Sequence, residues 1–89
     1  MRRKTFLDKI LVEVYVPAIN KSYDVYIPVE SKFYEVVKLV AVAISQASEG
    51  YFMTSNDEVL CDRVAGAIFN INLTTRELGL ENGDKIMLI

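Results

Sequence analysis

Residues 10–28, ILVEVYVPAINKSYDVYIP, decide the fold of this chain. Apolar and other residues alternate over residues 10–16 and again over residues 23–27, a period of two that is typical of strands. A proline ends each run, and residues 18–21 between them predict a turn. The stretch therefore predicts a β-hairpin with one apolar face, in which the expected facing pairs are Val16 with Tyr23, Val14 with Val25, and Val12 with Ile27.

Residues 31–48 predict a helix, with Ser31 as its N-cap and Gly50 as its C-terminal stop. Many of these residues are β-branched, which lowers helix propensity, but the run without Gly, Pro or Asn is too long for a strand. At 3.6 residues per turn, the expected buried stripe consists of Phe33, Val36, Val37, Val40, Ile44 and Ala47. Val42 and Leu39 fall on the opposite side. Either they contact a partner or a second copy, or this helical phase is wrong by one residue.

The remaining residues predict shorter elements, with strands at 58–61, 67–69 and 85–89. Thr74 and Glu77 have the spacing of a capping box, which begins a short helical turn with Leu78 and Leu80 as apolar anchors. The last strand is expected to return beside the first. This order describes an α+β fold of the β-grasp type, a mixed sheet of four to five strands with one helix packed across it. We expect residues 9–89 to form one domain, after a disordered basic tail at residues 1–8.

The composition leaves little material for catalysis. The chain has 89 residues with no His and one Cys, which excludes an internal disulfide and suits a reducing compartment. Cys61 has no histidine to activate it, so a buried or sheet-face thiol is expected rather than a nucleophile. The acidic residues Asp57, Glu58 and Asp62 lack the spacing of a calcium loop and predict a solvated turn. We expect no catalytic residue, no metal and no cofactor.

The basic residues are concentrated at the beginning of the chain. Arg2, Arg3, Lys4 and Lys9 are four of ten basic residues, which leaves the remaining chain acidic and poorly suited to nucleic acid. The tail has an alternative use as an adaptor for RNA or an anionic membrane. Asp8 and Lys9 interrupt the apolar run that a signal peptide needs. The longest apolar run covers only residues 39–44, so we expect a cytoplasmic protein without a transmembrane segment.

At this point the chain resembles the ubiquitin-like superfamily over residues 9–89. Residues 73–89, LTTRELGLENGDKIMLI, are similar to the ubiquitin-like ending, a helical turn followed by the last strand. Residues 12–27 and the segment VLCD at 59–62 are more similar to small bacterial proteins of the YukD and EsaB type, which accompany type VII secretion systems in Gram-positive bacteria. This resemblance implies a cytosolic, non-conjugated protein that assists or regulates a secretion machine by binding other proteins. It implies no catalytic residues.

The chain departs from ubiquitin at its last residue. Ile89 stands where modifiers and the sulfur carriers of thiamin and molybdopterin synthesis need a terminal Gly-Gly, so we expect no conjugation. The alternative is a modifier or sulfur carrier whose reactive end is missing from this sequence.

The outward face of the sheet is the candidate binding surface. If the hairpin valines point toward the helix, alternation turns Leu11, Tyr15 and Tyr26 away from it. With Ile86 and Leu88 inward, the last strand adds Met87 and Ile89 to the same outer face. We expect this apolar patch to bind a protein partner, with a homo-oligomer as one form of that contact. The alternative is that these five are ordinary exposed apolar residues.

Overall fold

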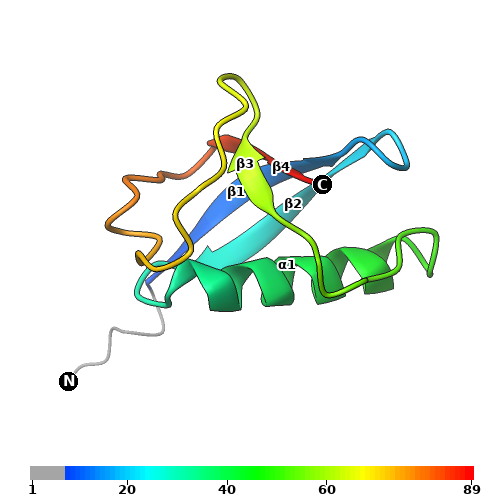
Figure 1. The fold of residues 1–89 in the computed structure, drawn as a ribbon, viewed down its shortest axis with the longest axis horizontal. Helices are drawn as coiled ribbons and strands as arrows, with labels where there is room; N and C mark the ends of the chain where they lie inside the picture. The colour runs from blue at the N-terminus through cyan, green and yellow to red at the C-terminus, as the bar shows by residue number, and fades with distance from the viewer. Residues whose placement is uncertain (1–7) are drawn as a thin grey trace.

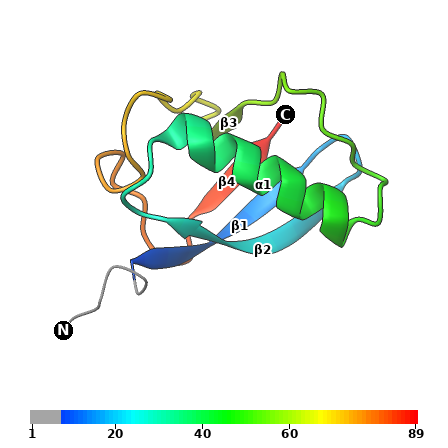
Figure 2. The same ribbon diagram turned by 90° about the horizontal axis from the view of Figure 1, so that it is seen from below.

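The fold is one four-stranded sheet with one helix across it, in a computed structural model that describes residues 8–89. Strands β1 (Lys9–Val16) and β2 (Lys21–Pro28) precede helix α1 (Phe33–Ala47), which is followed by β3 (Leu60–Asp62) and β4 (Lys85–Leu88). The strand order is β2-β1-β4-β3, with β1 antiparallel to β2 and parallel to β4. Figures 1 and 2 show α1 crossing one face of this sheet. The predicted β-grasp with a mixed sheet is confirmed.

The tail that was predicted to be disordered, with Arg2, Arg3 and Lys4, lies outside the described residues except for Asp8. Among residues 8–89, no helix combines the length and the apolar character needed to cross a membrane.

The hairpin forms with the predicted apolar face, but its register is wrong by two residues. Val14 pairs with Tyr23 and Val12 with Val25, because Val16 already pairs with Lys21. The turn is tighter than expected: the Ile19 and Asn20 amides donate to the Val16 and Pro17 carbonyls at 3.2 Å each. Asn20 adopts a left-handed conformation with φ 53°, which asparagine tolerates well. A shift of two residues keeps every side chain on its face, so the alternation in the sequence could not detect it.

Helix α1 begins later than predicted, and Ser31 is not its N-cap. The N-cap is Lys32, whose side chain makes no capping hydrogen bond. The first amides of the helix are satisfied by a distant loop instead, since Phe33 donates to the Leu73 carbonyl at 2.8 Å and Tyr34 to the Ile71 carbonyl at 3.1 Å. These backbone groups take the role that a capping side chain would have.

The buried stripe of α1 follows the prediction except at its C-terminal end. Ala47 is exposed, whereas Ala41 and Ser48 are buried. The stripe runs from Ile44 to Ser48, one turn on, so Ala47 falls on its flank. The Ser48 hydroxyl remains satisfied in this position, because it donates to the Ser45 carbonyl at 3.2 Å and accepts from the Phe52 amide at 3.0 Å. The phase of the helix is otherwise as predicted.

The residues after Gly50 form less regular structure than predicted. Strand β3 covers Leu60–Asp62 instead of residues 58–61. The strand expected at 67–69 is only an isolated bridge between Cys61 and Ile68. Next to this bridge, Phe69 turns inward, where its ring meets the Phe33 ring edge-on with 5.3 Å between centroids. Of the four to five strands expected, residues 8–89 therefore form four, and the segment at 67–69 is not a strand.

The core lies between α1 and the inner sheet face. Its members are the alternate residues of the strands and the stripe of the helix, with Phe52 from the following loop: Val12, Val14, Val16, Ile27, Phe33, Val36, Val37, Val40, Ala41, Ile44, Phe52, Leu60, Ile86 and Leu88. Leu78 and Leu80 pack against this cluster as the predicted apolar anchors. Burial of these aliphatic groups is the main stabilising term of the fold.

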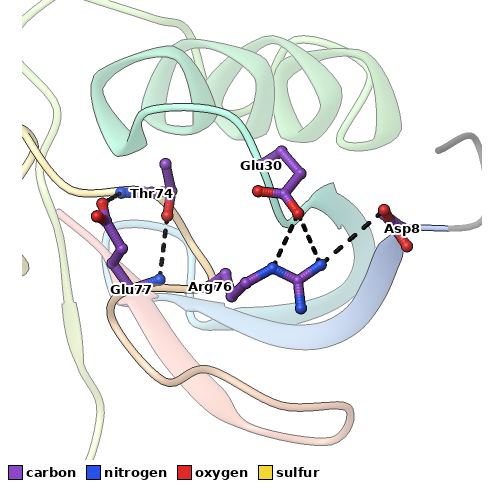
Figure 3. Close-up of polar contacts among 5 residues, drawn as sticks. All are labelled: Asp8, Glu30, Thr74, Arg76 and Glu77. Atoms are coloured by element: carbon purple, nitrogen blue, oxygen red, sulfur yellow. Dashed lines mark hydrogen bonds and ion pairs between the residues drawn. The ribbon is translucent and has the colours of Figure 1, made fainter.

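A polar cluster holds the segment between β3 and β4 in place (Figure 3). The predicted capping box is confirmed: the Thr74 amide donates to Glu77 at 2.8 Å, and the Glu77 amide donates to the Thr74 hydroxyl at 3.0 Å. These hydrogen bonds from Thr74, with the nearby Lys32 charge, lower the pKa of Glu77. Next to them, the Arg76 guanidinium pairs with Glu30 at 2.8 Å and reaches Asp8 at 3.9 Å. The segment is thereby tied to the start of β1 and the end of β2.

Candidate protein-binding surface

The outer face of the sheet carries three rows of side chains across β2, β1 and β4. Strand alternation places Leu11, Glu13 and Tyr15 on this face, because Val12, Val14 and Val16 are buried against α1. The strand register then gives each of these β1 residues its neighbours on either side. No described helix covers this face, as Figures 1 and 2 show from two directions.

The two apolar rows contain the residues singled out from the sequence. In one row, Tyr26 of β2 lies beside Leu11 of β1. On the opposite side of Leu11, the Gly83 amide donates a hydrogen bond to the Leu11 carbonyl at 2.8 Å. In the other row, Tyr15 has Met87 of β4 as its neighbour. Tyr26 is 63% exposed, whereas Leu11, Tyr15 and Met87 are half-buried.

Ile89 lies one position beyond β4 and is 53% exposed. Its backbone is held in the sheet, because its amide donates to the Val59 carbonyl at 3.0 Å and its carbonyl accepts from the Val59 amide at 2.9 Å. The five residues therefore share the outer face, with Ile89 at its edge.

A charged row separates the two apolar rows, and the sequence reasoning missed it. Asp24, Glu13 and Lys85 are direct neighbours across β2, β1 and β4. Arg63, just after β3, reaches over β4 so that its guanidinium lies 3.1 Å from the Glu13 carboxylate. The outer face is thus a patterned surface, in which apolar rows alternate with charges. The alternation of charged and apolar residues along β1 was the available signal.

Arg63 also covers part of the apolar surface. Its guanidinium carbon lies 4.3 Å from the centre of the Tyr15 ring, within the range of a cation–π contact. The Tyr15 hydroxyl donates to the Asn20 side-chain oxygen at 2.8 Å. These contacts fix the Tyr15 ring in one orientation, so it is a preorganised surface element rather than a free side chain.

Cys61 has the environment of a structural thiol. It pairs with Met87 in the register of β3 and β4 and is 1% exposed. Burial, with the nearby negative charge of Asp62, raises the pKa of the Cys61 thiol. A raised pKa lowers the thiolate fraction at neutral pH, and the thiolate is the reactive form. This geometry does not activate Cys61 as a nucleophile.

The acidic residues near β3 make local contacts. The Glu58 carboxylate accepts hydrogen bonds from the Ser55 amide and hydroxyl. Slight burial raises the pKa of Glu58, but these hydrogen bonds outweigh it, so the pKa is lowered overall. Asp62 accepts from the Ala65 amide. Within residues 8–89, no three acidic, His or Cys side chains are arranged to hold a metal ion.

The outer side of α1 offers a second, smaller surface. Leu39 and Val42 are 43% and 50% exposed, so their outward position is real and the alternative of a wrong helical phase is excluded. Val42 lines a groove of about 370 Å³ between α1 and residues 54–59, together with Tyr34 and Ile71. The walls of this groove are mostly apolar.

Comparison with known proteins supports the fold. No family model and no curated protein matches the sequence. The structure is similar to the ubiquitin-like domain of the Mycobacterium tuberculosis type VII secretion system protein ECCD1, with a TM-score of 0.73, 10% identity, and 91% of this chain and 97% of that chain covered. It is also similar to a Caldiarchaeum subterraneum ubiquitin, with a TM-score of 0.67, 16% identity and 91% of each chain covered.

A third similar structure belongs to a larger assembly. One chain of the MycP5-free ESX-5 inner membrane complex aligns with a TM-score of 0.68 and 16% identity, over 92% of this chain and 21% of that one. At these identities the likeness establishes the architecture. The chain has the ubiquitin-like β-grasp fold.

Proposed function

We propose that residues 9–89 form a non-enzymatic ubiquitin-like module that binds other proteins through the outer face of its sheet. The observation that carries this proposal is the uncovered outer face, on which the large side chain of Tyr26 is 63% exposed. Exposed aromatic and Met side chains supply much buried area when a partner covers them, at low entropic cost. The anchor residues of this module are Tyr15, Tyr26 and Met87, with Leu11 and Ile89 completing the contact.

Among residues 8–89, the lack of activated groups supports a binding role over a catalytic one. The single thiol, Cys61, is buried and has a raised pKa. The lowered pKa of Glu58 belongs to a carboxylate that is hydrogen-bonded within its own turn, which is a structural arrangement. A general acid or base would need a pKa near the working pH and a cleft around its substrate.

We assign the module to a type VII secretion system, where it serves as a cytoplasmic accessory or regulator of the YukD and EsaB kind in a Gram-positive bacterium. The support is that one structural neighbour, ECCD1, is by name a type VII secretion system protein, and that another is a chain of the ESX-5 inner membrane complex. The subunits of the secretion complex are the partners we expect.

The experiment compares three forms of the chain in its native host. Tagged wild type, Tyr26→Asp and Tyr51→Asp are purified under identical conditions, and the captured proteins are quantified by mass spectrometry. Tyr51 is 84% exposed but follows α1, away from the outer face, so it is a matched control. We expect secretion subunits to be captured by wild type and by Tyr51→Asp, and to be lost with Tyr26→Asp. Equal capture by all three forms would contradict the proposal.

A further inference from the structure

We propose that the outer face of the sheet is the contact surface between two copies of this chain, related by a two-fold axis that runs along β1. The inference rests on the proposed function, because it names a partner for the same face. It is carried by the pattern of the three rows. In each row, the residue on the β2 side of β1 differs in charge or in size from the residue on the β4 side. When one copy is turned over onto another, these two residues face each other, so each row complements itself.

The charged row has opposite signs at its ends. Asp24 lies on one side of Glu13 and Lys85 on the other. Adjacent strands are about 4.8 Å apart, so these two charges stand about 10 Å apart across the sheet. A two-fold axis along β1 exchanges the two sides, which places Asp24 of each copy opposite Lys85 of the other. Among the described residues, Asp24 and Lys85 take part in no ion pair within the chain, so both charges remain available.

The centre of this row is electrically balanced. Glu13 is paired with Arg63 of its own chain at 3.1 Å. On the axis, each such pair faces the same pair of the second copy, and no excess of one sign accumulates there. The arrangement avoids the repulsion that two unpaired like charges would produce at a symmetric contact.

The row of Tyr26 and Leu11 complements itself in size. Tyr26 projects on the β2 side of Leu11 and is 63% exposed. On the other side of Leu11 lies Gly83, which has no side chain, and apart from its own chain neighbours no heavy atom lies within 4 Å of the place where a Cβ would be. The same two-fold axis brings the Tyr26 ring of each copy over Gly83 of the other. The large Tyr26 side chain of one copy therefore faces a position of the other copy that has no side chain.

The row of Tyr15 shows the same relation with the sides reversed. Ser22, which is small, lies on the β2 side of Tyr15, and Met87 lies on the β4 side. The axis sets Met87 of each copy over Ser22 of the other, while the two Tyr15 rings, each in contact with Arg63 of its own chain, lie nearest the axis. Met is a flexible side chain that fits irregular contacts. Three independent rows thus agree on one axis.

The contact is expected to be weak. Three strands and three rows form a smaller area than the about 800 Å² per partner that stable interfaces bury. Attraction between the Asp24 and Lys85 charges is screened by salt, so the dimer should be favoured at low ionic strength. A partner in the secretion complex would compete with the second copy for the same face, so the dimer would hold the surface closed until that partner is met.

The test uses charge exchange between copies. Sedimentation equilibrium at low salt is measured for wild type, Asp24→Lys, Lys85→Asp and an equimolar mixture of the two variants. In either variant alone, both intermolecular pairs become like-charge contacts, and we expect the dimer to weaken about tenfold or more. In the mixture, every facing pair has opposite signs again, so association should return to the wild-type level.

The controls keep the same charge changes off this face. Glu35→Lys and Lys38→Asp lie on exposed positions of α1 and should associate as wild type does. A wild type that stays monomeric at the highest concentration, variants that associate like wild type, or a mixture that stays monomeric would each overturn the inference. Because capture of secretion subunits is measured separately, a monomeric wild type that still captures them would overturn the dimer alone.

Discussion

Truncation of Val40 tests how α1 packs on the sheet. Val40 is 0% exposed in the middle of the buried stripe, whereas Val42, two residues later, is 50% exposed. Val→Ala at each site removes the same two carbons from the same helix. The pair therefore separates the effect of burial from the effect of helix propensity.

The structure gives different magnitudes for the two sites. At Val40, two buried carbons at about 0.8 kcal/mol each contribute about 1.6 kcal/mol, and the space left adds about 1 kcal/mol. Alanine returns about 0.5 kcal/mol through its better helix propensity, so the net loss of unfolding free energy is about 2 kcal/mol. At Val42 the half-exposed side chain loses only about half of this burial energy and no closed cavity forms. The free energy of unfolding should therefore change by no more than about 0.5 kcal/mol.

The assay is urea unfolding followed by circular dichroism. We expect Val40→Ala to lower the midpoint with an unchanged slope, and Val42→Ala to keep the wild-type midpoint. Equal losses at both sites would refute the packing described here, since they would place both side chains in similar surroundings. A larger loss at Val42 would mean that the helix presents its other side to the sheet.

Three further predictions concern single groups. Thr75→Val should raise the free energy of unfolding by about 1 kcal/mol in the same assay, because the Thr75 hydroxyl is buried without a hydrogen-bond partner. A loss of stability would show that this hydroxyl is satisfied. Glu77→Gln should lower the free energy of unfolding at neutral pH. Because folding lowers the pKa of Glu77, the difference in unfolding free energy from wild type should vanish as the pH falls through that lowered pKa. A difference independent of pH would contradict the capping contact. Cys61 should react slowly with a thiol reagent in the native protein and at the rate of a free thiol in denaturant, and a fast native reaction would contradict its burial and raised pKa.

The sequence predicted the elements whose side chains alternate between two environments. The faces of the hairpin, the stripe through Val36, Val40 and Ile44, and the capping box at Thr74 all follow from local spacing. In each case the chemistry of neighbouring residues decides the structure, because burial on one face needs a regular period.

Where the sequence-based predictions were wrong, the structure is decided by contacts that the local sequence does not reveal. The amides at the start of α1 are satisfied by carbonyls of Leu73 and Ile71, so no local residue could reveal the N-cap. The hairpin register depends on the tight turn at Asn20, because either register satisfies the alternation. The segment at Ile68 forms a single bridge, and its neighbour Phe69 packs on Phe33, which is distant in the sequence.

The candidate surface was predictable in its members but not in its pattern. Alternation within each strand placed Leu11, Tyr15 and Met87 on one face, as the structure also does. The charged row appears only when strands distant in sequence are set side by side, because Glu13 and Lys85 meet through the parallel pairing of β1 and β4. Arg63 over Tyr15 is a further contact of this kind.

We propose that this domain offers the uncovered face of its sheet to other polypeptides, a second copy of the chain among them. The most direct measurement follows backbone amide NMR shifts of the isotope-labelled chain as the total protein concentration is raised at low salt. We predict that the changes concentrate on Glu13, Tyr15, Asp24, Tyr26, Lys85 and Met87, with α1 unaffected. Changes confined to the α1 groove around Tyr34 and Val42 would contradict this choice of face, and no changes at any concentration would contradict the contact between two copies.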